Sequence, residues 1–220
     1  MRTALVTGAS RGIGAAIVQR LRADGCNVLA PTRQEMDLES NTSIDAYLSQ
    51  IKDHIDILVN DAGINRISIL TDIKDQDVDD TLQINLIAPL RIIRKVAPYM
   101  QKNGFGRILN ISSVWSIVSR AGRISYTMSK AALNGMTRSL AVELAPYNIL
   151  VNAVAPGYVL TDLTRQNNSE AELETIRQTI PLQRLAEPQE IANIVTFLCS
   201  EQNTYLTGQT LVVDGGFTCQ

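Results

Sequence analysis

The sequence predicts an α/β fold in which one doubly wound parallel sheet is covered by helices on both faces. Short apolar runs typical of buried strands alternate with longer stretches whose apolar residues recur every three or four positions. The first apolar run leads directly into a glycine turn, and no linker, repeat or low-complexity run interrupts the alternation. Residues 1–220 are therefore expected to form a single domain.

Composition and charge argue against several classes of partner and site. With 20 basic and 22 acidic residues, the chain has no surplus of positive charge for binding a nucleic acid or an anionic membrane. No uncharged apolar stretch approaches membrane-spanning length, and the first apolar run is too short for a signal peptide, so we expect a cytoplasmic protein. The single histidine, His54, and the widely separated Cys26, Cys199 and Cys219 predict neither a metal site nor a disulfide.

The stretch from Thr3 to Gly14 predicts a strand, a glycine turn and the start of a helix. Glycines allow the backbone to approach a ligand closely, and the free N–H groups at a helix start form an anion site suited to a pyrophosphate. The spacing G-x-x-x-G-x-G differs from the common dinucleotide fingerprint, and an ordinary strand-to-helix turn is the alternative. If the turn binds a dinucleotide, the contacting residues are expected to be Gly8, Ser10, Arg11, Gly12, Ile13 and Gly14.

The chain after the second predicted strand, 27–30, bears on the cofactor. An acidic residue there would bind a ribose hydroxyl and repel a 2′-phosphate, but the chain carries Arg33 instead. Arg33, helped by Arg11, forms a positive fork for the 2′-phosphate of NADP; the alternative is that both are solvated loop residues. Asp37 and Leu38 follow so soon that the usual next helix is reduced to a turn, and a helix over 43–52 comes after it.

The middle of the chain places polar residues just after predicted strands. A third strand over 56–59 runs into Asn60-Asp-Ala62-Gly63, and a long helical stretch over 77–100 carries Asn85. The next strand, 106–112, is followed by Ser113. Because open parallel sheets hold their chemistry at the carboxyl ends of the strands, these residues are expected to meet at one edge.

A helix over 125–145 carries the most informative pair, Tyr126 and Lys130. Residues four apart lie on one face of a helix, so the phenol and the ammonium point the same way. A nearby positive charge lowers a phenol pKa toward the range useful for acid/base chemistry. The pattern alone is weak, since a half-buried aromatic and a solvated lysine share this spacing.

The last third predicts a strand over 148–154, a polar segment over 158–188, a helix over 188–197 and a closing strand over 210–213. Pro156 and Gly157 end the first of these strands, and a short helix is expected near 170–179. A polar, irregular segment beside a sheet edge is typical of a lid, so 158–188 is a candidate substrate lid.

Taken in order along the whole chain, these motifs resemble the classical short-chain dehydrogenase/reductase family, and the pattern is most similar to its 3-oxoacyl-(acyl-carrier-protein) reductases. The glycine turn from Thr7 to Gly14 resembles the family's cofactor turn, and 60–63 resembles its N-N-A-G with Asp61 in place of the second asparagine. Ser113 stands thirteen residues before Tyr126, and 126–130 is a Y-x-x-x-K motif. The resemblance implies a Rossmann-type fold that forms one dinucleotide-binding and catalytic domain over 1–220.

The resemblance also implies roles. Tyr126 would be the general acid that protonates a carbonyl oxygen, Ser113 would hydrogen-bond that oxygen, and Lys130 would lower the Tyr126 pKa and bind the nicotinamide ribose. Asn85 would hold a water that links Lys130 to solvent. The further cofactor contacts implied are Arg33, Asp37, Leu38, Asn60, Ala62, Gly63, Tyr126, Pro156, Gly157, Val159 and Thr161.

The activity implied is that of an NADPH-dependent carbonyl reductase acting on a ketone, with a 3-oxoacyl thioester as one candidate substrate. The alternatives are an NAD-dependent alcohol or sugar dehydrogenase, and an NADP-binding regulator without catalysis. The resemblance implies a homotetramer assembled through the helices at 81–101 and 126–146. Trp115 and Tyr158 flank the expected carbonyl site, either as a substrate wall or as aromatic cover over the sheet edge.

Overall fold

The computed structural model describes residues 1–51 and 54–220 and forms a six-stranded, all-parallel sheet in the order β2-β1-β3-β4-β5-β6. Neighbouring strands pair in parallel register, as in Thr7 opposite Asn60 and Asn60 opposite Asn110. The strands are β1 (Thr3–Thr7), β2 (Asn27–Leu29), β3 (Ile57–Asn60), β4 (Gly106–Ile111), β5 (Ile149–Pro156) and β6 (Thr210–Val213). The predicted doubly wound fold is confirmed, with the strand order reversing direction at β1.

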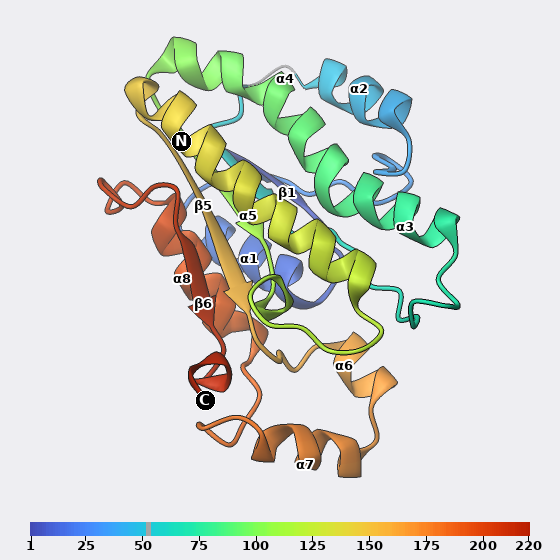
Figure 1. The fold of residues 1–220 in the computed structure, drawn as a ribbon. Helices are drawn as coiled ribbons and strands as arrows, with labels where there is room; N and C mark the ends of the chain where they lie inside the picture. The colour runs from blue at the N-terminus through green and yellow to red at the C-terminus, as the bar shows by residue number, and fades with distance from the viewer. Residues whose placement is uncertain (52–53) are drawn as a thin grey trace.

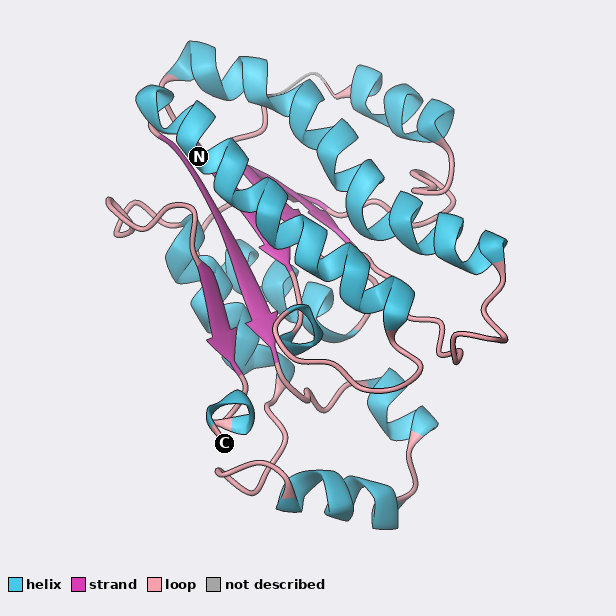
Figure 2. Cartoon of the chain, viewed as in Figure 1, coloured by secondary structure: helices cyan, strands magenta, loops and turns pink. Residues whose placement is uncertain are grey.

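Helices cover both faces of the sheet (Figures 1 and 2). The α-helices are α1 (Gly12–Ala23), α2 (Asn41–Gln50), α3 (Asp75–Leu82), α4 (Ala88–Asn103), α5 (Ile124–Leu144), α6 (Asp162–Asn167), α7 (Glu170–Gln178) and α8 (Pro188–Cys199). One apolar core joins α1 and α8 to the sheet, and a second joins α2, α4 and α5 to the opposite face. In Figure 1, α6 and α7 lie beyond the arrowheads of β5 and β6, so the lid segment projects from the carboxyl edge.

Several predicted boundaries shift by a few residues, and two elements differ in kind. The stretch predicted as one helix over 77–100 is α3, a π-helical turn at Gln83–Ile87 and then α4, with Pro98 on the exposed side of α4. The short helix α6 was not predicted. The compression after β2 is confirmed, because residues 33–40 contain turns and no helix. The helix predicted over 43–52 is α2, and Lys52 lies outside the described residues.

Within 1–51 and 54–220, no helix is both long enough and apolar enough to cross a membrane. The same part of the chain contains no group of three or more His, Cys, Asp or Glu side chains placed to hold a metal ion.

Candidate functional site

The glycine turn after β1 packs directly against the loop after β3. Gly8 has a φ of +71°, and a side-chain carbon there would stand 2.6 Å from the amide nitrogen of Ala62, so only glycine fits. Thr7 Oγ1 accepts hydrogen bonds from the amides of Asp61 and Ala62, both at 3.2 Å. This contact fixes the two loops at the point where the strand order reverses, which is where open α/β sheets bind ligands.

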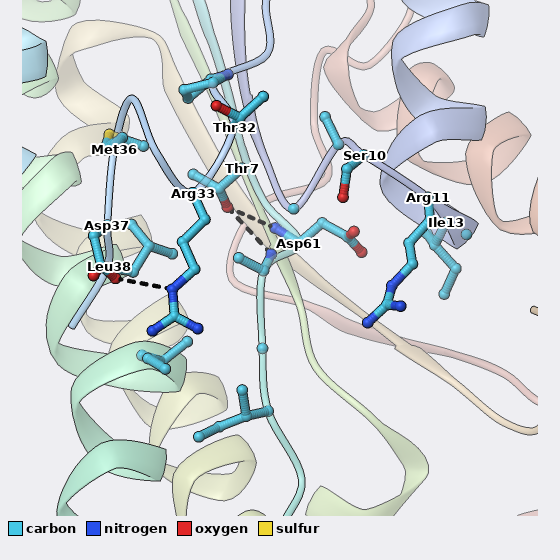
Figure 3. Close-up of a pocket in the computed structure, with 18 of the residues that line it drawn as sticks. Thr7, Ser10, Arg11, Ile13, Thr32, Arg33, Met36, Asp37, Leu38 and Asp61 are labelled. Atoms are coloured by element: carbon cyan, nitrogen blue, oxygen red, sulfur yellow. Dashed lines mark hydrogen bonds and ion pairs between the residues drawn. The ribbon is translucent and has the colours of Figure 1, made fainter. Parts of the chain in front are cut away.

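A cavity of about 340 Å³ opens beside this turn (Figure 3). Eleven of the predicted cofactor residues line it: Gly8, Ser10, Arg11, Gly12, Ile13, Arg33, Asp37, Leu38, Ala62, Gly63 and Thr161. Three apolar residues that were not predicted also line the cavity, and they carry no pattern in the sequence beyond apolarity: Met36, Ile64 and Ile84. The glycines leave room for a ligand to approach the backbone, and apolar side chains form the walls of the cavity. A cavity of this kind fits a dinucleotide.

Other predicted cofactor residues lie outside this cavity. The Asn60 amide donates to Asn110 Oδ1 at 2.9 Å, which ties β3 to β4 beneath the edge. Gly157 packs against Asp214, where a side-chain carbon would approach Cα to 2.8 Å, and Val159 is buried. Thr161, in contrast, lines the cavity and is the N-cap residue of α6. Its methyl group would lie 3.2 Å from a side-chain carbon placed at Gly12. Thr161 is thus the point where the lid segment meets the glycine turn.

The two arginines proposed for a 2′-phosphate differ in their contacts. Arg33 lies 2.8 Å from Glu39 and 3.6 Å from Asp37, and its side chain is 71% exposed. Arg11 forms no ion pair within the described part of the chain. Figure 3 shows both side chains reaching into the cavity, on opposite sides of Asp61.

Tyr126 and Lys130 share one face of α5, as predicted, and Ser113 follows β4 beside them. Lys130 is buried, and its ammonium donates to the carbonyl oxygen of Ile111 at 2.6 Å. The ammonium nitrogen lies 5.7 Å from the centre of the Tyr126 ring. Ser113 Oγ accepts a hydrogen bond of 3.3 Å from the amide of Trp115. The three side chains therefore meet at the carboxyl edge of β4.

The electrostatic effect on Tyr126 differs from the expected one. Burial raises the Tyr126 pKa above its ordinary value, and the charge of Asp61 acts in the same direction. Interaction with Ser113 and the charge of Arg123 act to lower it. The expectation that Lys130 lowers the Tyr126 pKa is therefore not met in this structure. Burial lowers the pKa of Lys130 to about 8, and the charge of Asp61 acts to raise it.

Asn85 sits in the π-helical turn and holds a loop in place. Its Oδ1 accepts from the Ile64 amide at 2.9 Å, and its Nδ2 donates to the Ile64 carbonyl at 2.9 Å and to Ser129 Oγ at 3.1 Å. A side-chain carbon at Gly63 would stand 3.2 Å from Asn85 Oδ1 and 3.5 Å from Lys130 Nζ. Gly63 thus separates Asn85 from Lys130, and Ser129 is a contributing residue that no sequence signal indicated.

Three aromatic rings stand beside this group. Trp115, Tyr158 and Phe217 pack edge to face, with ring centres 5.6 to 6.1 Å apart. Tyr158 and Phe217 also pack against a small apolar cluster formed by Leu173, Ile180 and Leu185 of the lid segment. The aromatic cluster connects the loop after β4 to the lid segment and to the C-terminal turn.

Comparisons with known proteins agree with this architecture. A family profile described as enoyl-(acyl carrier protein) reductase matches residues 8–218. The chain is 38% identical to the 3-oxoacyl-(acyl-carrier-protein) reductase FabG of Aquifex aeolicus (strain VF5), covering 98% of this chain and 96% of that protein. It is 36% identical to Dehydrogenase/reductase SDR family member 4 of Pongo abelii, in an alignment that covers 98% of this chain and 87% of that protein.

Among solved structures, 4-hydroxyisoleucine dehydrogenase complexed with NADH superposes with a TM-score of 0.94 at 29% identity. The alignment covers 100% of both chains, so the shortened segment after β2 leaves no large part of either chain unmatched. Both the family profile and the curated relatives span nearly the whole chain. The chain therefore belongs to the short-chain dehydrogenase/reductase family of NAD(P)-dependent oxidoreductases.

Proposed function

We propose that this protein is an NADPH-dependent carbonyl reductase that converts a small ketone to an alcohol. The single observation that carries the proposal is the meeting of Ser113, Tyr126 and Lys130 at the carboxyl edge of β4, near the glycine-lined cavity. A bound nicotinamide would supply the hydride to the carbonyl carbon. The names of the curated relatives make a 3-oxoacyl thioester the first substrate to test.

Each side chain has a role that its surroundings support. The Tyr126 hydroxyl gives its proton to the carbonyl oxygen as the C=O π electrons move onto that oxygen. A pKa raised by burial keeps this hydroxyl protonated in the resting enzyme, which suits an acid. Ser113 orients the carbonyl oxygen, and the buried Lys130 binds ribose hydroxyls. Asn85 fixes the loop after β3 and, through Ser129, the first turns of α5.

The assay that tests this function follows absorbance at 340 nm with NADPH or NADH and a panel of ketones, including an acetoacetyl thioester, diketones, quinones and keto sugars. Oxidation of NADPH by at least one ketone is the expected result. Tight NADPH binding with no turnover of any ketone would instead support a regulator that has lost catalysis.

The preference for NADPH is expected to depend on Arg33. In the wild type, the Arg33 guanidinium can exchange its ion pairs with Glu39 and Asp37 for a contact with a 2′-phosphate. At so exposed a site, that contact is worth about 1–2 kcal/mol, and Arg33→Ala removes it. We expect the NADPH Michaelis constant to rise roughly 5- to 30-fold while that for NADH stays within twofold. Arg20→Ala is the matched control, because Arg20 pairs with Asp24 on α1, away from the cavity.

A second candidate is an NAD-dependent dehydrogenase, which the ion pairs of Arg33 with Asp37 and Glu39 favour. Two carboxylates beside the ribose would repel a 2′-phosphate and accept hydrogen bonds from a ribose hydroxyl. The solved relative named above is complexed with NADH. An unchanged NADPH constant in Arg33→Ala, with NADH the better cofactor in the wild type, would favour this candidate.

We further propose that residues 158–188 act as a substrate lid. We also propose that the chain assembles as a homotetramer through α4 and α5. Apolar side chains stand exposed on both helices, with Tyr99 61% and Val142 80% accessible. Val142→Glu is expected to reduce the mass measured by light scattering to that of a dimer or monomer. Gln178→Glu on α7 introduces the same charge elsewhere and is expected to leave the mass unchanged, and a monomeric wild type would contradict the proposal.

A further inference from the structure

Arg123 is a cation placed beside the catalytic group, and among the described residues it has no anionic partner. It is the N-cap residue of α5, three residues before Tyr126, which lies in the first turn of that helix. Its guanidinium carbon lies 5.7 Å from the centre of the Trp115 ring. The guanidinium is also close enough to the hydroxyls of Tyr126 and Tyr158 for its charge to act on both.

The backbone around Arg123 is held in a fixed position relative to Tyr126. The Arg123 carbonyl accepts a hydrogen bond of 2.7 Å from the Thr127 amide, which begins the helix. The Gly122 carbonyl accepts from the Ser68 amide at 3.1 Å. Gly122 has a φ of +81°, and a side-chain carbon there would meet Ile67 at 2.9 Å. Two loops therefore clamp the residue that carries the guanidinium.

The Arg123 side chain lacks the contacts that normally stabilise a partly buried arginine. Within the described ranges it forms no ion pair and no hydrogen bond, and its Nε is buried without a partner. Arg107 provides the contrast: its Nε is also unpartnered, but its terminal nitrogens donate to the carbonyl oxygens of Gly106, Asn148 and Asn203. The buried Nε is out of reach of a ligand, but the terminal nitrogens of Arg123 are not fully buried and form no hydrogen bond among the described residues, so a ligand with acceptor oxygens could bind them.

The charges around this position are positive as well. Burial lowers the pKa of Arg123, and the positive charge of Arg120 acts in the same direction, so a second cation lies near this guanidinium. The neutral wall formed by Trp115, Tyr158 and Phe217 reduces screening by water at the guanidinium. Such a position attracts an anionic group of the substrate.

Resting on the ketone reduction proposed above, we propose that Arg123 binds a carboxylate of the substrate, so that the enzyme acts on a short oxo acid. A 3-oxo acid carries a charged carboxylate where a 3-oxoacyl thioester carries an uncharged carbonyl. Arg123 directly precedes the helix that carries Tyr126, and its guanidinium lies over the ring of Trp115, whose amide donates to Ser113 Oγ. The tips of Arg123 and Tyr126 can therefore reach a carboxylate and a ketone oxygen in one small molecule, and Arg123 selects between acid and ester.

The test compares acetoacetate with two uncharged relatives, ethyl acetoacetate and the acetoacetyl thioester of N-acetylcysteamine. Wild type is expected to have a higher kcat/KM for acetoacetate than for either relative. In Arg123→Gln, we expect the acetoacetate Michaelis constant to rise roughly 10- to 100-fold, with the two uncharged substrates changed less than threefold. Arg123→Lys should recover part of the loss, and Arg22→Gln on the outside of α1 is the control.

A second readout separates substrate binding from a purely structural role. The groups that act on the Tyr126 pKa are Ser113, Arg123 and Asp61, and Arg123 lowers it. Removing this charge should move the alkaline limb of the ethyl acetoacetate pH profile to higher pH, with the melting temperature and the cofactor Michaelis constant unchanged. A structural role alone would lower the melting temperature and leave that limb in place.

The possible failures can be told apart. Two results would overturn the carboxylate proposal and leave the reductase proposal intact. In the first, the wild type reduces the ester or the thioester as efficiently as acetoacetate. In the second, the Arg123→Gln variant loses activity toward all three substrates equally. If no ketone of either kind is reduced with NADPH or NADH, the reductase proposal itself falls, and the assignment of Arg123 falls with it.

Discussion

Tyr126→Phe is expected to reduce kcat by about 10²- to 10⁴-fold with the best ketone found, because the ring is kept and only the proton donor is lost. Burial raises the pKa of this hydroxyl, which keeps it protonated, and the hydroxyl interacts with Ser113. Cofactor binding should persist, since the glycine turn and the cavity lining do not include this side chain. Turnover at 340 nm and the cofactor-induced shift in melting temperature measure the two properties separately.

Tyr205→Phe is the matched control for this substitution. Tyr205 is 96% exposed and lies in the turn before β6, so the loss of its hydroxyl should leave kcat unchanged. A Tyr126→Phe variant that keeps more than a third of wild-type kcat would remove Tyr126 from the chemistry. A variant that loses both turnover and cofactor binding would point to a structural role for the hydroxyl.

The fold could be predicted from the sequence because the strands and most of the helices carry their own patterns. The apolar run Thr3–Thr7 is buried throughout as β1, and the closing strand Thr210–Val213 matches β6 in full. The spacing of four between Tyr126 and Lys130 fixes their relative direction in any helix. Such features are local, so they need no knowledge of the surrounding chain.

The features that the sequence left unpredicted depend on contacts between distant segments. The π-helical turn at Gln83–Ile87 places Asn85 against Ile64, and nothing in the local residue pattern separates it from the α-helices on either side. The Tyr126 pKa is raised because burial outweighs nearby charges, which spacing does not reveal. In the part of the chain that the structure describes, no hydrogen-bond acceptor reaches the buried Nε of Arg123, and this depends on which segments the fold brings around it.

Gly14→Ala is expected to weaken both folding and cofactor binding, because the new methyl group has no room. It would stand 2.4 Å from the carbonyl oxygen of Gly8 and 2.6 Å from Oδ2 of Asp61. Relieving this overlap must move the glycine turn or the loop after β3, at a cost of about 1–3 kcal/mol. For a chain of this size that is a fall in melting temperature of roughly 2–12 °C.

Gly135→Ala makes the same chemical change in α5 and should have the opposite effect. The nearest atom to its added methyl group is a guanidinium nitrogen of Arg138 at 3.9 Å, and alanine is favoured over glycine inside a helix by about 0.5–1 kcal/mol. For Gly14→Ala we expect a lower melting temperature and a higher NADPH Michaelis constant. For Gly135→Ala we expect a slightly higher melting temperature and an unchanged NADPH Michaelis constant. Equal tolerance of both substitutions would mean that the backbone at Gly14 yields without moving the turn, and the turn would then not be the rigid cradle on which the cofactor proposal depends.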